Sequence, residues 1–369
     1  MPRKGESIFK RQDGRWEARY IHHYENNKAI YRYLYGKTYS EAKHKRIIEQ
    51  NMDIKPTKKR ANMSFKVIAE EWLETIRNSV KESTYTRYVR IVQKQLVPRL
   101  SCKSVTAIES SDINRIINNM LNSPSNPLSP KTVVDIICVF KSIAKYGKSK
   151  KYFYINLDLI KYPSKDKKMV RVLDRHTIIE LEKSIVSSED VMSVGIIFAL
   201  YSGVRIGELC GIKWEDIDLK NLTVTINRTI ERIADLSPSA NKTKVIINTP
   251  KTDSSRRVIP IPKFLKKVLQ KHSKNGNCYF LTGTEKYIEP HSCYIKYKKI
   301  LSDNNIEHYS FHALRHTFAT RCVEAGVDIK SLSEMLGHSS INTTLSVYVH
   351  PSLEQKRLQL EKIKPSVYL

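Results

Sequence analysis

The residues best suited to chemistry lie in the second half of the chain, where basic side chains precede a tyrosine. Arg205 stands between two glycines that permit a tight turn. His312 and Arg315 are three residues apart, a spacing that puts two side chains on one face of a helix. His338 and Tyr348 follow, ten residues apart. Guanidinium groups bind phosphate oxygens with paired hydrogen bonds, and a deprotonated phenol can attack phosphorus. These five side chains together could act on a phosphate ester.

The charge of the chain also indicates a phosphate-bearing partner. Its 369 residues include 64 Lys and Arg against 37 Asp and Glu, a formal net charge of +27. Such an excess repels itself unless it is neutralised, and nucleic acid fits this need better than an anionic membrane surface. The longest uncharged stretch, 191–204, is shorter than the roughly 18 to 20 apolar residues of a spanning helix, and the amino terminus has no apolar signal core. We expect a cytosolic nucleic-acid-binding protein that neither spans nor binds a membrane.

Each of these side chains, taken singly, could also have an ordinary role in metal binding or packing. His312 and His316 have the spacing of a zinc-binding helix, but Ala313 stands where such enzymes carry glutamate, so we expect no metal. Arg205 alone could cap a carbonyl, and Tyr348 alone could be a core residue. Such roles account for each residue separately but not for their joint order and flanking sequences.

With their neighbours, these residues resemble the signature of the tyrosine recombinase and phage integrase family. The first arginine stands in Gly-Val-Arg-Ile-Gly-Glu-Leu (203–209), His-Ala-Leu-Arg-His begins at 312, and Leu-Gly-His (336–338) precedes Tyr348. In that family a lysine on a β-hairpin completes the site, and the segment 249–260 resembles this hairpin with Lys251 at the matching place. The resemblance covers about 170–360 and extends, with less specificity, to the helical and amino-terminal segments before it.

The resemblance implies that a DNA phosphate is held by three of these side chains. The site of such an enzyme must stabilise a pentacoordinate phosphorane, whose non-bridging oxygens gain negative charge. Arg205 and Arg315 are assigned to those oxygens because each guanidinium donates two hydrogen bonds at once. His338 is expected to donate a hydrogen bond to the same phosphate.

The other three residues are expected to move the proton and the bond. Tyr348 is expected to be the nucleophile. A phenol with a pKa of about 10 is a poor nucleophile at neutral pH until a base takes its proton, and His312 is the candidate for that base. Lys251 is expected to protonate the departing 5′ oxygen. A phosphotyrosine linkage keeps the energy of the broken phosphodiester, so we expect no cofactor, in agreement with a sequence that has no GxxxxGK[ST] loop.

The fold that must position this site is expected to be a multidomain α+β chain. Residues 1–55 predict a small three-stranded sheet followed by a helix that Ser40 caps, and the resemblance makes them an arm-type DNA-binding domain. Residues 63–150 predict a four-helix domain that binds the core site, with helices opened by Ser64 and by Ser129-Pro130. The lysine-rich stretch 148–168 is expected to be a surface linker. Residues 169–369 predict a mainly helical catalytic domain with a small antiparallel sheet and a carboxy-terminal tail.

The amino-terminal segment should divide its side chains between a core and a DNA surface. Its aromatic residues Trp16, Tyr20 and Tyr33 are expected to form the core of the small sheet. Its basic residues are the candidates for phosphate or base contact. These DNA-contact candidates are Arg15, Arg19, Arg32 and Lys37.

The resemblance implies an integrase of a mobile element that cleaves and rejoins double-stranded DNA at core and arm sites. It further implies a homotetramer on DNA, exchange through a Holliday junction, an excisionase and DNA-bending helper proteins, and a nucleoid location in a bacterium. Three alternatives stay open: a chromosome or plasmid dimer resolvase of the same family, a catalytically silent DNA-binding regulator, and a type IB topoisomerase.

Overall fold

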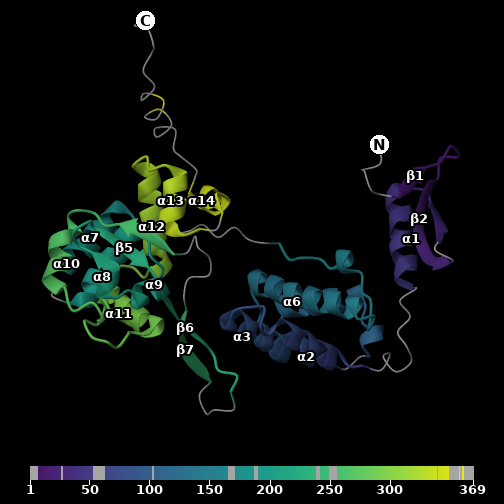
Figure 1. Cartoon of the computed structure of the whole chain (residues 1–369), viewed down its shortest axis with the longest axis horizontal. Helices are drawn as coiled ribbons and strands as arrows, with labels where there is room; N and C mark the ends of the chain where they lie inside the picture. The colour runs from purple at the N-terminus through teal and green to yellow at the C-terminus, as the bar shows by residue number, and fades with distance from the viewer. Residues whose placement is uncertain are drawn as a thin grey trace, which may run out of the picture. The chain divides into compact units, whose positions relative to one another are not determined.

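The computed structural model describes residues 7–25, 28–52, 63–101, 104–164, 171–186, 190–237, 242–248, 256–338, 340–348, 357 and 360. The chain divides into two compact units, Met1–Asp166 and Lys167–Leu369 (Figure 1). Helices and small antiparallel sheets alternate along it, which confirms a mixed fold of helix and sheet. In the part of the chain so described, no helix is long and apolar enough to cross a membrane.

The first unit opens with the predicted three-stranded sheet, whose antiparallel strands lie in the order β1-β2-β3. Helix α1 packs on the sheet around a small core of Ile8, Ala18 and Ala42. The helix begins one residue before the predicted cap Ser40, and the hydroxyl of Thr38 accepts the hydrogen bond from the Glu41 N–H at 3.1 Å. The elements are β1 (Ile8–Lys10), β2 (Trp16–Glu25), β3 (Lys28–Gly36) and α1 (Tyr39–Met52).

Strand alternation decides which aromatic side chains reach that core. Trp16 packs against it and Tyr20 is 5% exposed. Tyr33 pairs with Arg19 across the ladder and is 50% exposed, so it lies on the opposite face. The expectation that Tyr33 belongs to the core is therefore wrong, because its strand parity puts it with the outward side chains.

The predicted helices of the next segment all form. Ser64 and Ser129 cap two of them, accepting from the N–H groups of Val67 at 3.4 Å and Thr132 at 3.2 Å. One helix of this segment is interrupted by a π-helical turn, Val92–Leu96. The α-helices are α2 (Phe65–Ile76), α3 (Glu82–Ile91), α4 (Val97–Leu100), α5 (Ser110–Leu121) and α6 (Pro130–Ser149), with short 3-10 turns at Val105–Ala107 and Leu157–Leu159.

The core of this helical segment continues past α6. Phe153, Ile155 and Ile160 are each at most 6% exposed and belong to the same buried cluster as Phe65 and Phe140. The expectation of a surface linker over 148–168 is therefore wrong for this part, because a few apolar residues among many lysines are enough to anchor the chain.

The second unit is built around α8 (Val191–Ser202), which is buried on nearly all sides. Around it lie a sheet in the order β4-β5-β8 and a separate hairpin of β6 and β7. The remaining elements are α7 (Arg175–Val186), α9 (Ile206–Gly211), a 3-10 turn at Trp214–Asp216, β4 (Ile217–Asp218), β5 (Thr223–Ile226), β6 (Thr229–Ala234), β7 (Thr243–Asn248), β8 (Arg257–Pro260), α10 (Leu265–His272), α11 (Pro290–Asp303), α12 (Phe311–Glu324), α13 (Ile329–Leu336) and α14 (Ile341–Tyr348).

Candidate active site

The turn from α8 into α9 presents Arg205. Gly203 ends α8 with a φ of +65°, and a Cβ at this position would lie 2.4 Å from the Phe318 ring, so only glycine fits. Arg205 then takes an extended conformation as the residue that precedes α9. Its side chain is 41% exposed, which leaves the guanidinium accessible to a ligand from solvent.

Arg315 is the buried centre of the site. It lies on α12, and at 2% exposure it is among the largest fully buried side chains. Its Nη1 donates to the carbonyl of Gly203 at 2.7 Å and its Nη2 to the carbonyl of Leu336 at 2.7 Å. One guanidinium thus joins the turn that carries Arg205 to the end of α13.

His338 joins the cluster from the loop after α13. Its Nε2 is 2.9 Å from Arg315 Nη2, and its Nδ1 is 2.8 Å from the hydroxyl of Thr344 on α14. Arginine has only donors, so Nε2 must accept and the imidazole proton must lie on Nδ1, where it is donated to Thr344. His338 therefore bonds Arg315 as an acceptor through Nε2.

Burial and positive charge keep both histidines of the cluster neutral. Burial first, and then the charges of Arg315, Arg205, Arg257 and His312, lower the pKa of His338 to about 4. Burial, then Arg315 and Arg205, also lower the pKa of His312 below its ordinary value. Neutral imidazoles are available here as acceptors at neutral pH.

Two charged residues that the sequence did not single out hold this arrangement. The carboxylate of Glu208 accepts from the Arg205 N–H at 2.9 Å and from Arg205 Nη1 at 2.8 Å. Arg257 donates to both Glu208 oxygens, at 3.1 and 2.9 Å. Burial raises the pKa of Glu208, but the Arg257 hydrogen bonds and the charges of both arginines outweigh it and bring the pKa to about 2. The signal for Glu208 was its position three residues after Arg205, in the first turn of α9.

The structure thus gathers four of the six predicted residues, Arg205, His312, Arg315 and His338. Tyr348 is the last residue of α14, the helix whose Thr344 bonds His338, and its side chain lies outside what the structure describes. Lys251 also lies outside the described residues, between β7 and β8. Two guanidinium groups beside two imidazoles can bind a phosphate and stabilise charge that develops on it.

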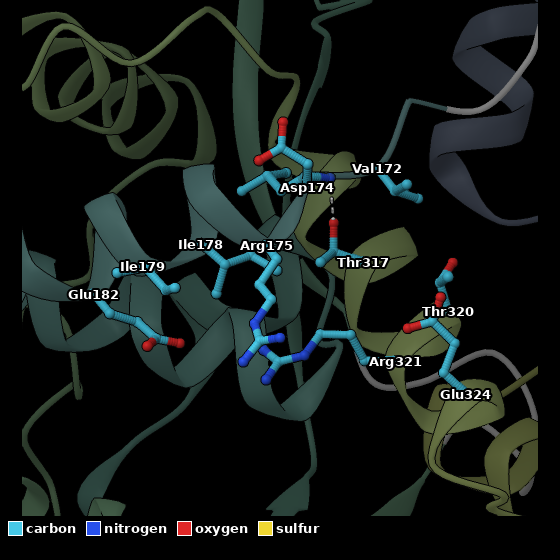
Figure 2. A pocket seen from close by; sticks show the side chains of 11 residues that line it. Val172, Asp174, Arg175, Ile178, Ile179, Glu182, Thr317, Thr320, Arg321 and Glu324 are labelled. Atoms are coloured by element: carbon cyan, nitrogen blue, oxygen red, sulfur yellow. Dashed lines mark hydrogen bonds between the residues drawn. The ribbon is translucent and has the colours of Figure 1, made fainter.

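A pocket of ≈ 520 Å³ lies on another side of α12 (Figure 2). Helical periodicity turns its wall residues Thr317, Arg321 and Glu324 away from the face that carries Arg315. Arg321 stacks over the Tyr201 ring at 4.9 Å, and the Tyr201 hydroxyl donates to a Glu182 oxygen. Carboxylates and guanidinium groups offset one another in this wall, so the pocket is not built for a polyanion.

The predicted DNA-contact residues of the amino-terminal sheet differ in their surroundings. Arg19 lies on the exposed face, with its guanidinium carbon 5.2 Å from the Phe9 ring and 5.6 Å from the Tyr31 ring. Arg32 has the opposite strand parity, and its Nη1 lies 3.2 Å from Glu49 of α1. Arg15 pairs with Asp13 at 2.8 Å, and Lys37 is exposed beside α1. Arg15 also lies over an exposed ring, with its guanidinium carbon 5.4 Å from the Tyr35 ring, so Arg19 differs from it in contacting two rings and from Arg32 in its face of the sheet.

Family models match two segments of the chain. Residues 176–355 match the model described as "Phage integrase family", and residues 64–121 match "Phage integrase, N-terminal SAM-like domain". The first match spans α7 to α14 with all four gathered residues, and the second begins at the cap of α2.

Curated relatives match most of the chain. A protein called "Tyrosine recombinase XerC-like" from Caldanaerobacter subterraneus subsp. tengcongensis is 29% identical, over 92% of this chain and 93% of its own length. The integrase of Staphylococcus phage L54a is 24% identical, over 87% of this chain and 98% of its own length. The Tn916 transposase of Enterococcus faecalis is 27% identical over 60% of this chain and 63% of its own length.

Solved structures share the fold. The Tn1549 transposon integrase in complex with a circular intermediate DNA superposes with a TM-score of 0.65 at 21% identity, covering 82% of this chain and 100% of that one. A lambda integrase tetramer bound to a Holliday junction gives a TM-score of 0.57 at 14% identity, covering 96% of this chain and 99% of that one.

Proposed function

The chain belongs to the phage integrase family of tyrosine recombinases, and from this membership we propose how it recombines DNA. It is a site-specific recombinase that cleaves and rejoins DNA through a 3′-phosphotyrosyl linkage and moves a mobile element by integration and excision. The observation that carries the proposal is the cluster in which buried Arg315 binds Gly203, Leu336 and His338 beside Arg205.

The two arginines are proposed to bind the scissile phosphate. Arg205 reaches it from the α8–α9 turn, and Arg315 donates to the non-bridging oxygens from the orientation that Gly203 and Leu336 give its guanidinium. Arg315 already holds its place before DNA arrives, so little reorganisation is needed as negative charge develops on the phosphorane. His338 is proposed to donate to the phosphate once that anion raises the pKa of the imidazole and Nε2 takes up a proton from water.

The remaining residues are proposed to carry the bond exchange. The phenolic oxygen of Tyr348 forms a bond to phosphorus as the bond from phosphorus to the 5′ oxygen breaks. The phenol proton passes to His312, which is neutral at pH 7, and Lys251 gives a proton to the departing 5′ oxygen. Rejoining reverses these transfers, and the phosphotyrosine keeps the energy of the original bond. No cofactor or metal enters the proposed reaction.

A nicked DNA substrate tests this proposal. When the fragment behind the nick diffuses away, cleavage cannot reverse and the protein should remain covalently attached to DNA. Tyr348→Phe should form no adduct while still shifting the same DNA in a gel. A persistent adduct in the Phe variant would show that another residue is the nucleophile. A wild-type protein that forms no adduct would favour the catalytically silent regulator.

The amino-terminal sheet supports an integrase over a dimer resolvase, although the XerC-like relative is compatible with either. We propose that residues 1–55 bind separate arm sites, residues 63–150 bind the core site, and residues 169–369 cleave. Deleting residues 1–60 should abolish arm binding and leave core binding intact in gel-shift assays. Unchanged binding at candidate arm sites would favour the resolvase. Relaxation of supercoils without recombination would favour a topoisomerase.

The assembly is proposed to be a homotetramer on two paired DNA sites, with strand exchange through a Holliday junction. Excisionase and DNA-bending helper proteins would set the direction of exchange, and the bacterial nucleoid is the proposed place of action. A related integrase has been solved as a tetramer on such a junction, which supports this arrangement by likeness of fold. Truncation after His350 should abolish recombination if the carboxy-terminal tail joins the protomers.

A further inference from the structure

Arg257 occupies a position that strand alternation reserves for apolar side chains. In β8, Arg257 and Ile259 point inward while their neighbours point outward. Arg257 pairs with Ile226 of β5 and is 8% exposed. A guanidinium in such a place loses its hydration, so its partners must replace the hydrogen bonds to water.

Those partners belong to two other elements of the site. The Arg257 Nε donates to the carbonyl of Met335, the residue before the end of α13, at 2.6 Å. Its two Nη atoms donate to the two oxygens of Glu208, at 3.1 and 2.9 Å. Glu208 in turn accepts from the backbone N–H and the Nη1 of Arg205. One side chain on β8 is thereby bonded to the supports of both Arg205 and the His338 loop.

The loop that carries His338 passes close to the Arg257 side chain at Gly337. Gly337 ends α13 with a φ of +65°, and a Cβ there would lie 3.0 Å from Arg257 Nη1 and 3.1 Å from its Cδ. His338 follows immediately, so the path of the chain into His338 runs against the Arg257 side chain. Any change in the position of this guanidinium is transmitted to both neighbouring elements.

Stability alone does not account for such a buried ion pair. Replacing a buried pair by well-packed apolar residues is often neutral or stabilising, because the desolvation of both charges offsets their attraction. What the pair supplies is geometry, since a planar fork fixes the distance and angle between the groups it joins.

We propose that Arg257 is a positioning residue for strand cleavage, which holds Arg205 through Glu208 and His338 through the end of α13 in the places where they meet the scissile phosphate. The inference rests on the proposed function. Arg257 itself does not touch the reacting atoms.

Arg257→Lys in the full-length protein tests the inference, because an ammonium keeps the charge but cannot fork between Glu208 and Met335. The rate of covalent adduct formation on nicked DNA should fall about 10- to 100-fold, the effect of displacing a catalytic group slightly, while DNA affinity stays unchanged.

Arg228→Lys is the matched control. Arg228 also bridges a buried carboxylate and a carbonyl, at 2.6 Å to Asp216 and 3.2 Å to Gly211, but it bonds neither Glu208 nor Met335. This control should lose thermal stability without losing the cleavage rate.

A DNA substrate with an uncharged group in place of the scissile phosphate distinguishes a positioning role of Arg257 from a general loss of structure in the variant. A methylphosphonate at the scissile position lacks the charge that Arg205 binds, so the defect of Arg257→Lys relative to wild type should largely disappear on this substrate. An equal defect on both substrates, a wild-type rate on the phosphate, or an equal loss of rate in Arg228→Lys would overturn the inference. A wild-type protein that forms no adduct would instead refute the proposed function.

Discussion

Arg315 of the candidate active site and Arg19 of the amino-terminal sheet use the same kind of side chain in opposite ways. Arg315 is 2% exposed and is fixed by the carbonyls of Gly203 and Leu336. Arg19 is exposed and lies over the rings of Phe9 and Tyr31. The first guanidinium is oriented before any ligand arrives, and the second keeps its hydration and its freedom to turn.

This difference separates catalysis from affinity. A preoriented donor in a water-poor site stabilises charge as it develops, because nothing has to reorganise at that moment. An exposed cation contributes to DNA affinity mainly by releasing counterions, and added salt weakens that contribution. Substitutions in the cluster should therefore change rates and stability, whereas substitutions on the sheet should change binding and its salt dependence.

The largest effect is expected for Arg315→Lys. Lysine cannot reach Gly203, Leu336 and the phosphate together, so single-turnover adduct formation should fall by about 10²- to 10³-fold, the loss typical of removing one preoriented donor. Each buried carbonyl left without a donor should also lower the free energy of unfolding by roughly 1–3 kcal/mol in urea titrations. Binding of core DNA should change little. A large loss of affinity with an unchanged rate would make Arg315 resemble the arginines of the sheet.

The next effect is a change of stability with pH in Glu208→Gln. The folded protein holds the pKa of Glu208 at about 2, below the ordinary 4.5, so this carboxylate contributes stability above pH 4.5 that is lost as pH falls toward 2. The pH-dependent contribution should be roughly 3 kcal/mol at neutral pH and about half of that near pH 3. Urea unfolding of wild type and variant across this range measures it. A difference that does not vary with pH would show that Glu208 is not held as an ion.

A spectroscopic effect of intermediate size is expected at His338. Its pKa of about 4 predicts a neutral ring protonated on Nδ1 at pH 7, visible in nitrogen chemical shifts that His338→Gln assigns. The unfolded chain takes up a proton near pH 6.5 and the folded ring only near pH 4, so this group lowers stability as pH falls through that interval. Bound DNA should raise the midpoint. A midpoint near 6.5 without DNA would contradict the described contact with Arg315.

The smallest effect concerns two arginines of neighbouring strands. Arg19→Ala should weaken binding to arm DNA by up to about 10-fold and reduce the salt dependence, because one exposed cation is lost from an aromatic face. Arg32→Ala is the matched control, since Arg32 pairs with Glu49 on the helix side. Neither variant should alter cleavage of a core substrate. Equal losses of arm affinity would show that both faces of the strands meet DNA.

Local sequence patterns are sufficient where a single element decides the outcome. Ser64 and Ser129 are recognisable as helix caps, and alternating runs predict the three-stranded sheet. The parity of one strand is enough to misplace Tyr33, because a shift of one residue exchanges the two faces. The cap at Thr38 instead of Ser40 is beyond such reasoning, since both hydroxyls lie near the helix start and backbone geometry chooses between them.

The sequence predicts those site residues that stand in recognisable motifs. The motifs identify Arg205, His312, Arg315 and His338, which the structure brings together, whereas Lys251 and the side chain of Tyr348 lie outside the described residues. The roles of all six residues stay predictions. Glu208 and Arg257 escape such motifs, because they lie 49 positions apart and their pairing depends on how β8 packs against α9 and α13. Periodicity reports which face is buried, but not which two buried charges meet.

Three of the acceptors that hold Arg315 and Arg257 are main-chain oxygens, those of Gly203, Leu336 and Met335. Every amino acid has a carbonyl, so the side chains at 335 and 336 can be exchanged without removing an anchor point. Mutations can accumulate there over many generations while the geometry is inherited intact. Such an anchoring scheme tolerates sequence drift and gives an engineer freedom to redesign the surrounding packing while the arginines keep their places.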